Sequence, residues 1–185
     1  MKRAIVLLSF VCASALTCLA GDDVSDASVC QILANPMAYN GKMVRVRGRA
    51  LLAYQDFELS AKECDAEKPG IWLEYGSGPR HQPTIWCCGS QPKDKLTVVQ
   101  DKNFSAFDRS LTAQANKADC YNCYLYEVTA TLTGRIDAVE EAVVKDAEQK
   151  LAAAHGFGNL GAFRVRLVIR SVSDVEAKDV SDRYR

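Results

Sequence analysis

Two groups of cysteines have the types and spacing that could do the most distinctive chemistry in this sequence. Cys87 and Cys88 are adjacent, and Cys120 and Cys123 form a Cys-x-x-Cys pair. Four thiolates suit zinc or copper(I), a low-pKa Cys-x-x-Cys supports thiol redox chemistry, and oxidised cysteines form structural disulfides. Adjacent cysteines do not easily occupy two corners of a tetrahedron, and Cys120-x-x-Cys123 leads into a predicted strand rather than beginning a helix. The pattern favours disulfides, with metal or redox handling as the alternative.

The start of the chain indicates the compartment in which these cysteines would lie. Lys2 and Arg3 precede a short apolar stretch, and small residues stand at Cys18 and Ala20. This is typical of a cleavable secretory signal, and the apolar stretch is shorter than a membrane-spanning helix. We therefore expect residues 1–20 to be removed and the protein to be exported to the periplasm or the medium. Lipid attachment at Cys18 is the alternative.

Six cysteines remain after residue 20, and an even number in an exported chain predicts disulfides. They are Cys30, Cys64, Cys87, Cys88, Cys120 and Cys123. We expect Cys30 to pair with Cys64, because the predicted first helix and the loop after the second strand both flank the first hairpin. The other four cysteines are expected to pair among themselves in an order that the sequence leaves open.

Three arginines, Arg45, Arg47 and Arg49, alternate along one face of a predicted strand. Arg135 lies on a later strand, and Arg164, Arg166 and Arg170 alternate on the last one, so a basic outer stripe is expected. Two interpretations stay open. The arginines could form a solvated face paired with Asp and Glu across strands, or they could bind an anionic glycan or an acidic protein.

The net charge of the exported chain argues against nucleic acid as the partner. Loss of Lys2 and Arg3 leaves 21 basic and 23 acidic residues, a net charge of −2. A near-neutral domain has no bulk attraction for nucleic acid or for an anionic membrane.

No motif in the sequence predicts a cofactor, a resident metal or a catalytic set. Gly156 to Gly161 matches G-x-G-x-x-G by letter, but it precedes a predicted strand instead of following one and opening a helix. His81 and His155 are the only histidines, and no G-x-S-x-G occurs. Glu74 and Asp108 are the acids most worth locating.

The aromatic residues that could line a pocket are more simply explained as core, because they lie on predicted strands or beside cysteines. They are Phe57, Trp72, Tyr75 and Trp86.

Hydrophobic periodicity predicts the elements that must position these residues. Strands are expected over 42–50, 57–59, 71–75, 96–100, 128–136 and 163–170, and helices over 28–34, 103–114 and 138–154. The tail from Ser173 is polar and is expected to fray.

The order of these elements predicts one domain over residues 21–185 that is mainly β. Three strands of which the first is long, then the helix over 103–114 and two further strands, match the layout of an OB-like five-stranded Greek-key barrel. The first helix, the strand over 96–100 and the segment 138–154 would be additions to it. An open antiparallel α+β sheet uses the same alternation and is the alternative.

Several runs in the chain resemble a group of uncharacterised secreted bacterial proteins with no assigned function. They are IWLEYG at 71–76, WCCG at 86–89, FSAFDRSL at 104–111, VTATLTGR at 128–135 and GFGNLG at 156–161. The resemblance covers most of the exported chain and implies a bacterial exported domain. It implies no particular activity.

The sequence as a whole therefore predicts an exported, non-enzymatic module that binds a partner through a barrel face. The alternative function is metal or thiol-redox handling at Cys87, Cys88, Cys120 and Cys123.

Overall fold

The computed structural model describes residues 23–53, 56–64, 70–77, 96–113, 124–145, 151–154 and 156–184. The predicted signal segment 1–20 lies outside these ranges, and so do Cys87, Cys88, Cys120 and Cys123. Trp86, His81 and His155 lie outside them as well.

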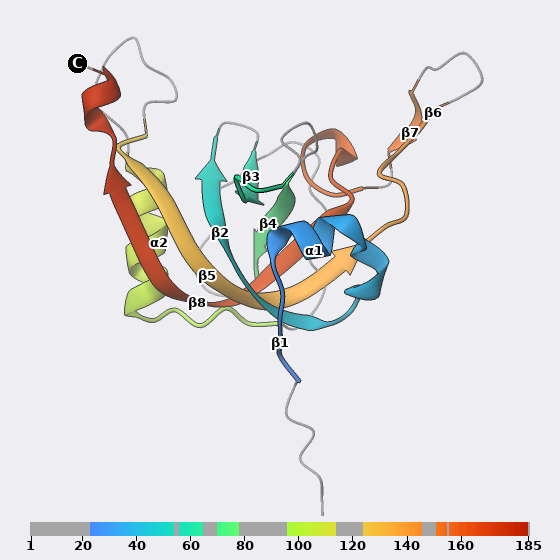
Figure 1. Cartoon of the computed structure of the whole chain (residues 1–185), viewed down its shortest axis with the longest axis horizontal. Coiled ribbons are helices and arrows are strands. Elements are labelled where there is room, and N and C mark those ends of the chain that lie inside the picture. The colour runs from blue at the N-terminus through green and yellow to red at the C-terminus, as the bar shows by residue number, and fades with distance from the viewer. Residues whose placement is uncertain are drawn as a thin grey trace, which may run out of the picture.

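The described chain is mainly β, as the sequence predicts, with two α-helices (Figure 1). In chain order the strands and α-helices are β1 (Ser25–Asp26), α1 (Val29–Ala34), β2 (Met43–Leu52), β3 (Phe57–Ser60), β4 (Ile71–Tyr75), α2 (Lys102–Thr112), β5 (Tyr126–Ala138), β6 (Val143–Lys145), β7 (Leu151–Ala154) and β8 (Val165–Asp179). Short 3-10 turns lie at Pro36–Ala38, Asn159–Gly161 and Ser181–Tyr184.

Six of the strands form one mixed sheet in the order β1-β2-β3-β4-β8-β5. The pairs β1–β2 and β4–β8 are parallel, so the sheet is not the antiparallel one that was the alternative. β2 also pairs with β5, from Met43 opposite Arg135 to Ala50 opposite Val128. The pairings from β2 through β3, β4, β8 and β5 therefore return to β2.

Local sequence signals set the ends of both helices. Ser28 and Gln31 form a reciprocal capping box at the start of α1, and Pro36 follows its end. Asp101 caps α2 by accepting a hydrogen bond from the Phe104 backbone N–H at 2.9 Å.

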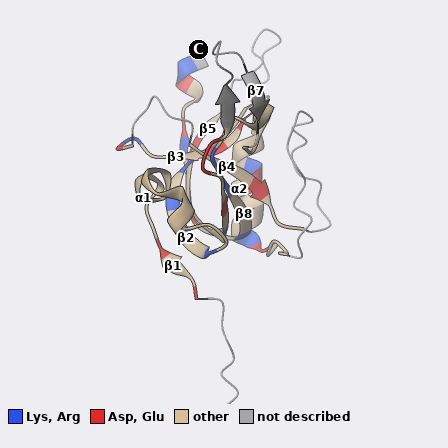
Figure 2. Cartoon of the chain, turned by 90° about the vertical axis from the view of Figure 1, so that its right-hand side faces the viewer, with Lys and Arg blue, Asp and Glu red and all other residues tan. Residues whose placement is uncertain are grey.

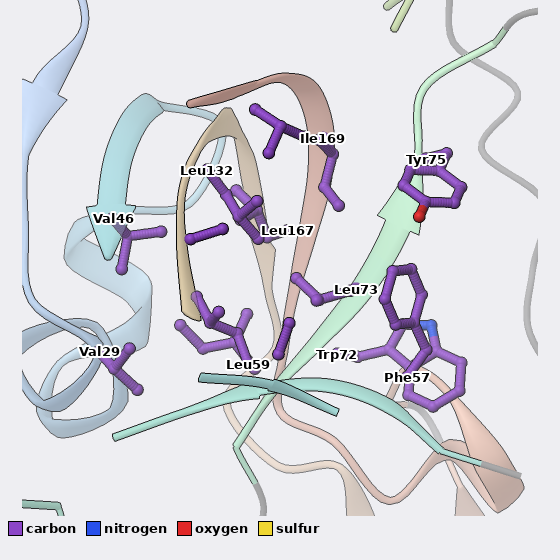
Figure 3. Close-up of a cluster of buried hydrophobic side chains, with 14 of the residues drawn as sticks. Val29, Val46, Phe57, Leu59, Trp72, Leu73, Tyr75, Leu132, Leu167 and Ile169 are labelled. Carbon is purple, nitrogen blue, oxygen red and sulfur yellow. The ribbon is translucent and has the colours of Figure 1, made fainter. Parts of the chain in front are cut away.

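The core lies between α1, α2 and the inner faces of the strands. Figure 3 shows part of it, with Val29 of α1 and buried side chains of the strands. On β2 the alternate residues Val44, Val46 and Ala50 are buried, as their period-two spacing predicts. The apolar stripe of α2, which consists of Phe104, Phe107 and Leu111, packs across β8 and β5 and is buried.

Three sequence predictions about secondary structure need correction. The helix expected over 138–154 is instead the antiparallel hairpin β6–β7. The backbone N–H of Val139 donates to the Arg164 carbonyl and that of Gly156 to the Ala142 carbonyl, so cross-strand bonds continue beyond the β5–β8 ladder. This pairing overrides the helix propensity of the Ala- and Glu-rich segment.

The tail from Ser173, which was expected to fray, continues β8 as far as Asp179. It pairs with β5 from Thr131 opposite Ser173 to Tyr126 opposite Asp179, so its backbone groups find partners although its side chains are polar. The strand expected over 96–100 is reduced to a single bridge between Ser77 and Thr97.

The predicted link between Cys30 and Cys64 is present as a disulfide, with Cα atoms 5.2 Å apart. It joins α1 to the turn that follows β3. Both segments flank the first hairpin, as the sequence predicts.

Candidate binding site

The arginine row of β2 (Arg45, Arg47 and Arg49) lies on the outer face of the sheet. Its residues alternate with the buried positions of the strand, and their side chains are 51%, 41% and 40% exposed. The predicted basic face of this strand is therefore accessible to a partner.

Each arginine of the row forms an ion pair with a carboxylate from another strand; β1 and β5 are neighbours of β2, and β8 lies beyond β5. Arg45 contacts Asp26 of β1 at 3.2 Å. Arg47 contacts Glu176 of β8 at 2.7 Å. Arg49 contacts Glu127 of β5 at 3.3 Å. This is the cross-strand pairing expected of a solvated face. The pairs of Arg45 and Arg47 have exposed carboxylates and each contribute about 0–1 kcal/mol to stability. Glu127 is only 17% exposed and also lies 3.7 Å from Arg183.

A hollow of about 510 Å³ lies at one end of the row, where β2, β5, β8 and the turn after β3 meet. Four basic and three acidic residues line it. The lining consists of Arg47, Gly48, Arg49, Ser60, Ala61, Lys62, Glu63, Glu127, Thr129, Glu176 and Lys178. On the ribbon as a whole, basic and acidic positions are likewise interspersed (Figure 2).

A second hollow of about 500 Å³ lies at the other end of the row. It is lined by Asp26, Ala27, Ser28, Gln31, Arg45, Arg47, Thr131 and Asp174. Arg47 lines both hollows, so its side chain stands between them.

A β-bulge in β8 helps to hold Arg47 in this position. Between the pairs Thr131–Ser173 and Thr129–Glu176 the register shifts, and Asp174 has a left-handed backbone with φ of 47°. The Arg47 guanidinium donates to the Asp174 carbonyl at 2.9 Å and to the Thr131 hydroxyl at 3.4 Å.

Gly48 is required in the floor of the first hollow by the close approach of β3. A Cβ at this position would lie 2.8 Å from Cγ of Leu59 and 2.9 Å from the Ser60 carbonyl oxygen. The missing side chain, on the buried face of β2, lets the two strands meet.

The structure does not bring Arg135 to either hollow. Its guanidinium forms a two-point contact with Asp137, at 2.7 and 2.9 Å. Asp137 in turn binds Arg166 at 2.6 Å, and Arg166 binds Glu74 at 3.1 Å. These four residues form a buried ion cluster where β4, β5 and β8 lie together.

The prediction that Arg166 belongs to a basic outer stripe is wrong. Arg166 is only 9% exposed, and its guanidinium also lies over the Phe157 ring, 4.7 Å from the centroid. Period-two alternation predicts the side of the strand on which Arg166 lies, but on that side its guanidinium is enclosed by Glu74 of the adjacent β4, by Asp137 of β5 and by the Phe157 ring.

The electrostatics of the buried ion cluster follow from burial and from its arginines. Burial raises the pKa of Glu74, although the charge and hydrogen bond of Arg166 and the Trp72 indole N–H oppose the rise. Burial would also raise the pKa of Asp137, but hydrogen bonds and charges from Arg135 and Arg166 outweigh it and lower that pKa.

The acids and aromatic residues singled out in the sequence have structural partners. Glu74 accepts from the Trp72 indole N–H at 3.2 Å. Asp108 accepts from the Tyr75 hydroxyl at 3.5 Å. Burial raises the pKa of Tyr75, and the nearby Asp108 carboxylate raises it further.

Trp72, Tyr75 and Phe57 are 3–5% exposed, which confirms their prediction as core (Figure 3).

Sequence reasoning missed several charged residues of the candidate site. Asp26, Lys62, Glu63 and Glu127 precede the predicted tail, and the others follow Ser173. Asp174, Glu176 and Lys178 lie in the stretch that was expected to fray. The period-two spacing of Glu176 and Lys178 was an available signal, because these polar residues alternate with Val175 and Ala177.

Comparison of the chain with protein-family models, with curated proteins and with solved structures finds no match. Within the described ranges no three or more His, Cys, Asp or Glu residues gather as a metal site would require. None of the described helices is long and apolar enough to cross a membrane.

Proposed function

We propose that this protein is an exported, non-enzymatic binding module built on an OB-type barrel. Three features support the barrel: the pairings return from β5 to β2, β4 and β8 are parallel, and α2 lies between β4 and β5 in the chain. In a five-stranded Greek-key barrel of this type, a helix between the third and fourth strands is a common addition.

The observation that carries the binding proposal is the arginine row together with the hollow of about 510 Å³ beside it. The row presents three guanidinium groups on strand positions. The carboxylates that hold Arg45 and Arg47 are 78% and 75% exposed, whereas Glu127 at Arg49 is 17% exposed. Because exposed pairs contribute little to folding, a partner can replace the carboxylate at Arg45 or Arg47 at small cost.

The lining of the hollow favours a charged polypeptide over a polyanionic glycan. Its four basic residues are accompanied by Glu63, Glu127 and Glu176. A uniformly anionic chain would place like charges against these carboxylates, which is unfavourable. A polypeptide with acidic side chains at intervals can contact the arginines and leave the glutamates facing neutral or basic groups.

Fluorescence anisotropy tests the proposal with two labelled probes, a nine-residue peptide of alternating Glu and Thr and a heparin oligosaccharide. We expect the peptide to bind more tightly than heparin and its affinity to fall as salt rises. The triple variant Arg45→Gln, Arg47→Gln, Arg49→Gln should weaken peptide binding at least tenfold.

Arg109→Gln is the matched control, because it removes one exposed charge from α2, away from both hollows. Equal binding by the triple variant and the wild type would refute the arginine row as a binding face. Binding of heparin alone would refute the choice of a polypeptide.

Export is tested separately by mass spectrometry of the protein recovered from the periplasm or the medium. Cleavage after Ala20 predicts Gly21 as the first residue. A recovered protein that still begins at Met1 would contradict the proposal of a cleaved signal.

A further inference from the structure

The two hollows beside the arginine row share one residue and lie on one face. Arg47 lines both of them, with Arg49, Lys62 and Lys178 on one side and Arg45, Asp26 and Asp174 on the other. From Arg45 to Arg49 the strand covers about 13 Å, which is the length of four to five extended residues. The hollows together therefore have the length of a short extended segment.

The bonds of Arg47 show which contact a bound segment would have to change. Its guanidinium is held by the Thr131 hydroxyl, by the Asp174 carbonyl and by the Glu176 carboxylate. The first two partners are uncharged groups of β5 and β8. Glu176 is different, because its side chain is 75% exposed and can turn into solvent at little cost.

The charges around Arg47 are not the same on its two sides. Apart from Arg47, the first hollow has three basic and three acidic residues, whereas the second has Arg45 against Asp26 and Asp174. The centre of the groove therefore attracts an acidic group, and the end near Asp26 attracts a basic one.

We infer that the two hollows are subsites of one groove, which takes an extended polypeptide segment with an acidic residue over Arg47 and a basic residue two positions away, near Asp26 and Asp174. The inference rests on the proposed function and specifies its partner. The acidic side chain takes the place of Glu176 at Arg47. The spacing follows because residues i and i+2 of a strand point to the same side, about 6.6 Å apart.

Binding of the nine-residue peptide Thr-Thr-Lys-Thr-Glu-Thr-Lys-Thr-Thr to the full exported protein tests this inference. Three control peptides should bind more weakly. The first has Gln in place of the central Glu, the second has Gln in place of both Lys, and the third is the three-residue peptide Thr-Glu-Thr. Each of these losses should be at least fivefold.

Two matched variants of the protein give opposite expectations. Arg47→Gln should lower the affinity for this peptide about tenfold. Glu176→Gln removes the competing carboxylate and should raise it by up to about fivefold. A purely structural role for the Arg47–Glu176 pair would not give this gain. Unfolding in urea checks that both variants are as stable as the wild type.

The possible failures are distinguishable. If the nine-residue and three-residue peptides bind equally, or if Glu176→Gln weakens binding, the joined groove is wrong while the arginine row can still be a binding face. If neither these peptides nor the Glu-Thr peptide binds, both the groove and the proposed function are wrong.

Discussion

The buried ion cluster around Glu74 and the arginine row of β2 are built from the same kinds of side chain in different surroundings. In the cluster the Arg166 and Glu74 side chains are 11% and 7% exposed. In the row, Arg47 and Glu176 are 41% and 75% exposed. Water can replace either partner in the row but is largely excluded from the cluster.

This difference separates structural ion pairs from ion pairs that can serve recognition. A buried charge that loses its partner stays desolvated and unpaired, so the cluster resists change. An exposed charge that loses its partner is hydrated, so the row can exchange partners. Arginine and carboxylate spacing along a strand does not distinguish the two cases, because burial decides them.

The largest effect is expected from removing Arg166 from the buried ion cluster. Arg166→Met leaves Glu74 without its cationic partner and takes one of two arginines from Asp137. The free energy of unfolding should fall by about 3–5 kcal/mol, measured by urea denaturation. A loss below about 1 kcal/mol would place the cluster in the same class as the exposed row.

The next largest effect is expected from removing the disulfide that joins α1 to the turn after β3. Cys64→Ser opens a loop with a sequence separation of 34 residues. Chain-entropy reasoning predicts a loss of about 3–4 kcal/mol. Calorimetry of this variant and of the double variant Cys30→Ser, Cys64→Ser should give similar melting temperatures. An unchanged melting temperature in both would contradict a stabilising link.

Glu74 and Asp137 should make the free energy of unfolding depend on pH in opposite directions. The pKa of Glu74 is raised above 4.5 in the folded protein, so its contribution to stability is present below pH 4.5 and is lost as pH rises through the folded pKa. The variant Glu74→Gln has no carboxyl to titrate at this position, so it should not lose this stability as pH rises. The free energy of unfolding of the variant, relative to the wild type, should therefore increase as pH rises.

Asp137 should show the opposite sign. Its pKa is lowered below 3.8 in the folded protein, so its stabilisation is present above pH 3.8 and is lost as pH falls through the folded pKa. Asp137→Asn should lack that loss on acidification. Urea denaturation of both variants and the wild type across this pH range measures the two differences. Profiles that run parallel to the wild type would contradict these assignments.

The smallest effect is expected in the arginine row. Arg45→Met breaks one exposed ion pair, with Asp26, and should change the free energy of unfolding by less than about 1 kcal/mol. It is the exposed counterpart of Arg166→Met: the substitution is the same, but Arg45 is exposed and has one carboxylate partner, whereas Arg166 is buried and has two. A loss of several kcal/mol would show that the row is structural.

Much of the fold follows from local patterns in the sequence. Alternation predicted β2 and β3, residues that favour sheet predicted β4, and helical spacing predicted α2. The Cys30–Cys64 link was predicted because the two segments flank the first hairpin. These features could be predicted because each depends on residues close in sequence or on segments joined by a short hairpin.

The errors arose where strand pairing, near or distant in sequence, decided the structure. The polar tail became part of β8 because the distant strand β5 supplies its hydrogen-bond partners. The segments Val143–Lys145 and Leu151–Ala154 became strands because they pair with each other. Intrinsic propensity and polarity describe a segment alone, whereas a strand forms only with its neighbour.

The sequence by itself determined that Arg45, Arg47 and Arg49 share one face of a strand, because side chains on a strand alternate. Only the tertiary structure decided their surroundings. It placed Asp26, Glu127 and Glu176 beside them, left a hollow on each side of Arg47, and buried Arg166, which the same alternation had predicted to be exposed. The physical reason is that alternation fixes the direction of a side chain, while its solvation and its partners depend on the strands and turns that the fold packs against it.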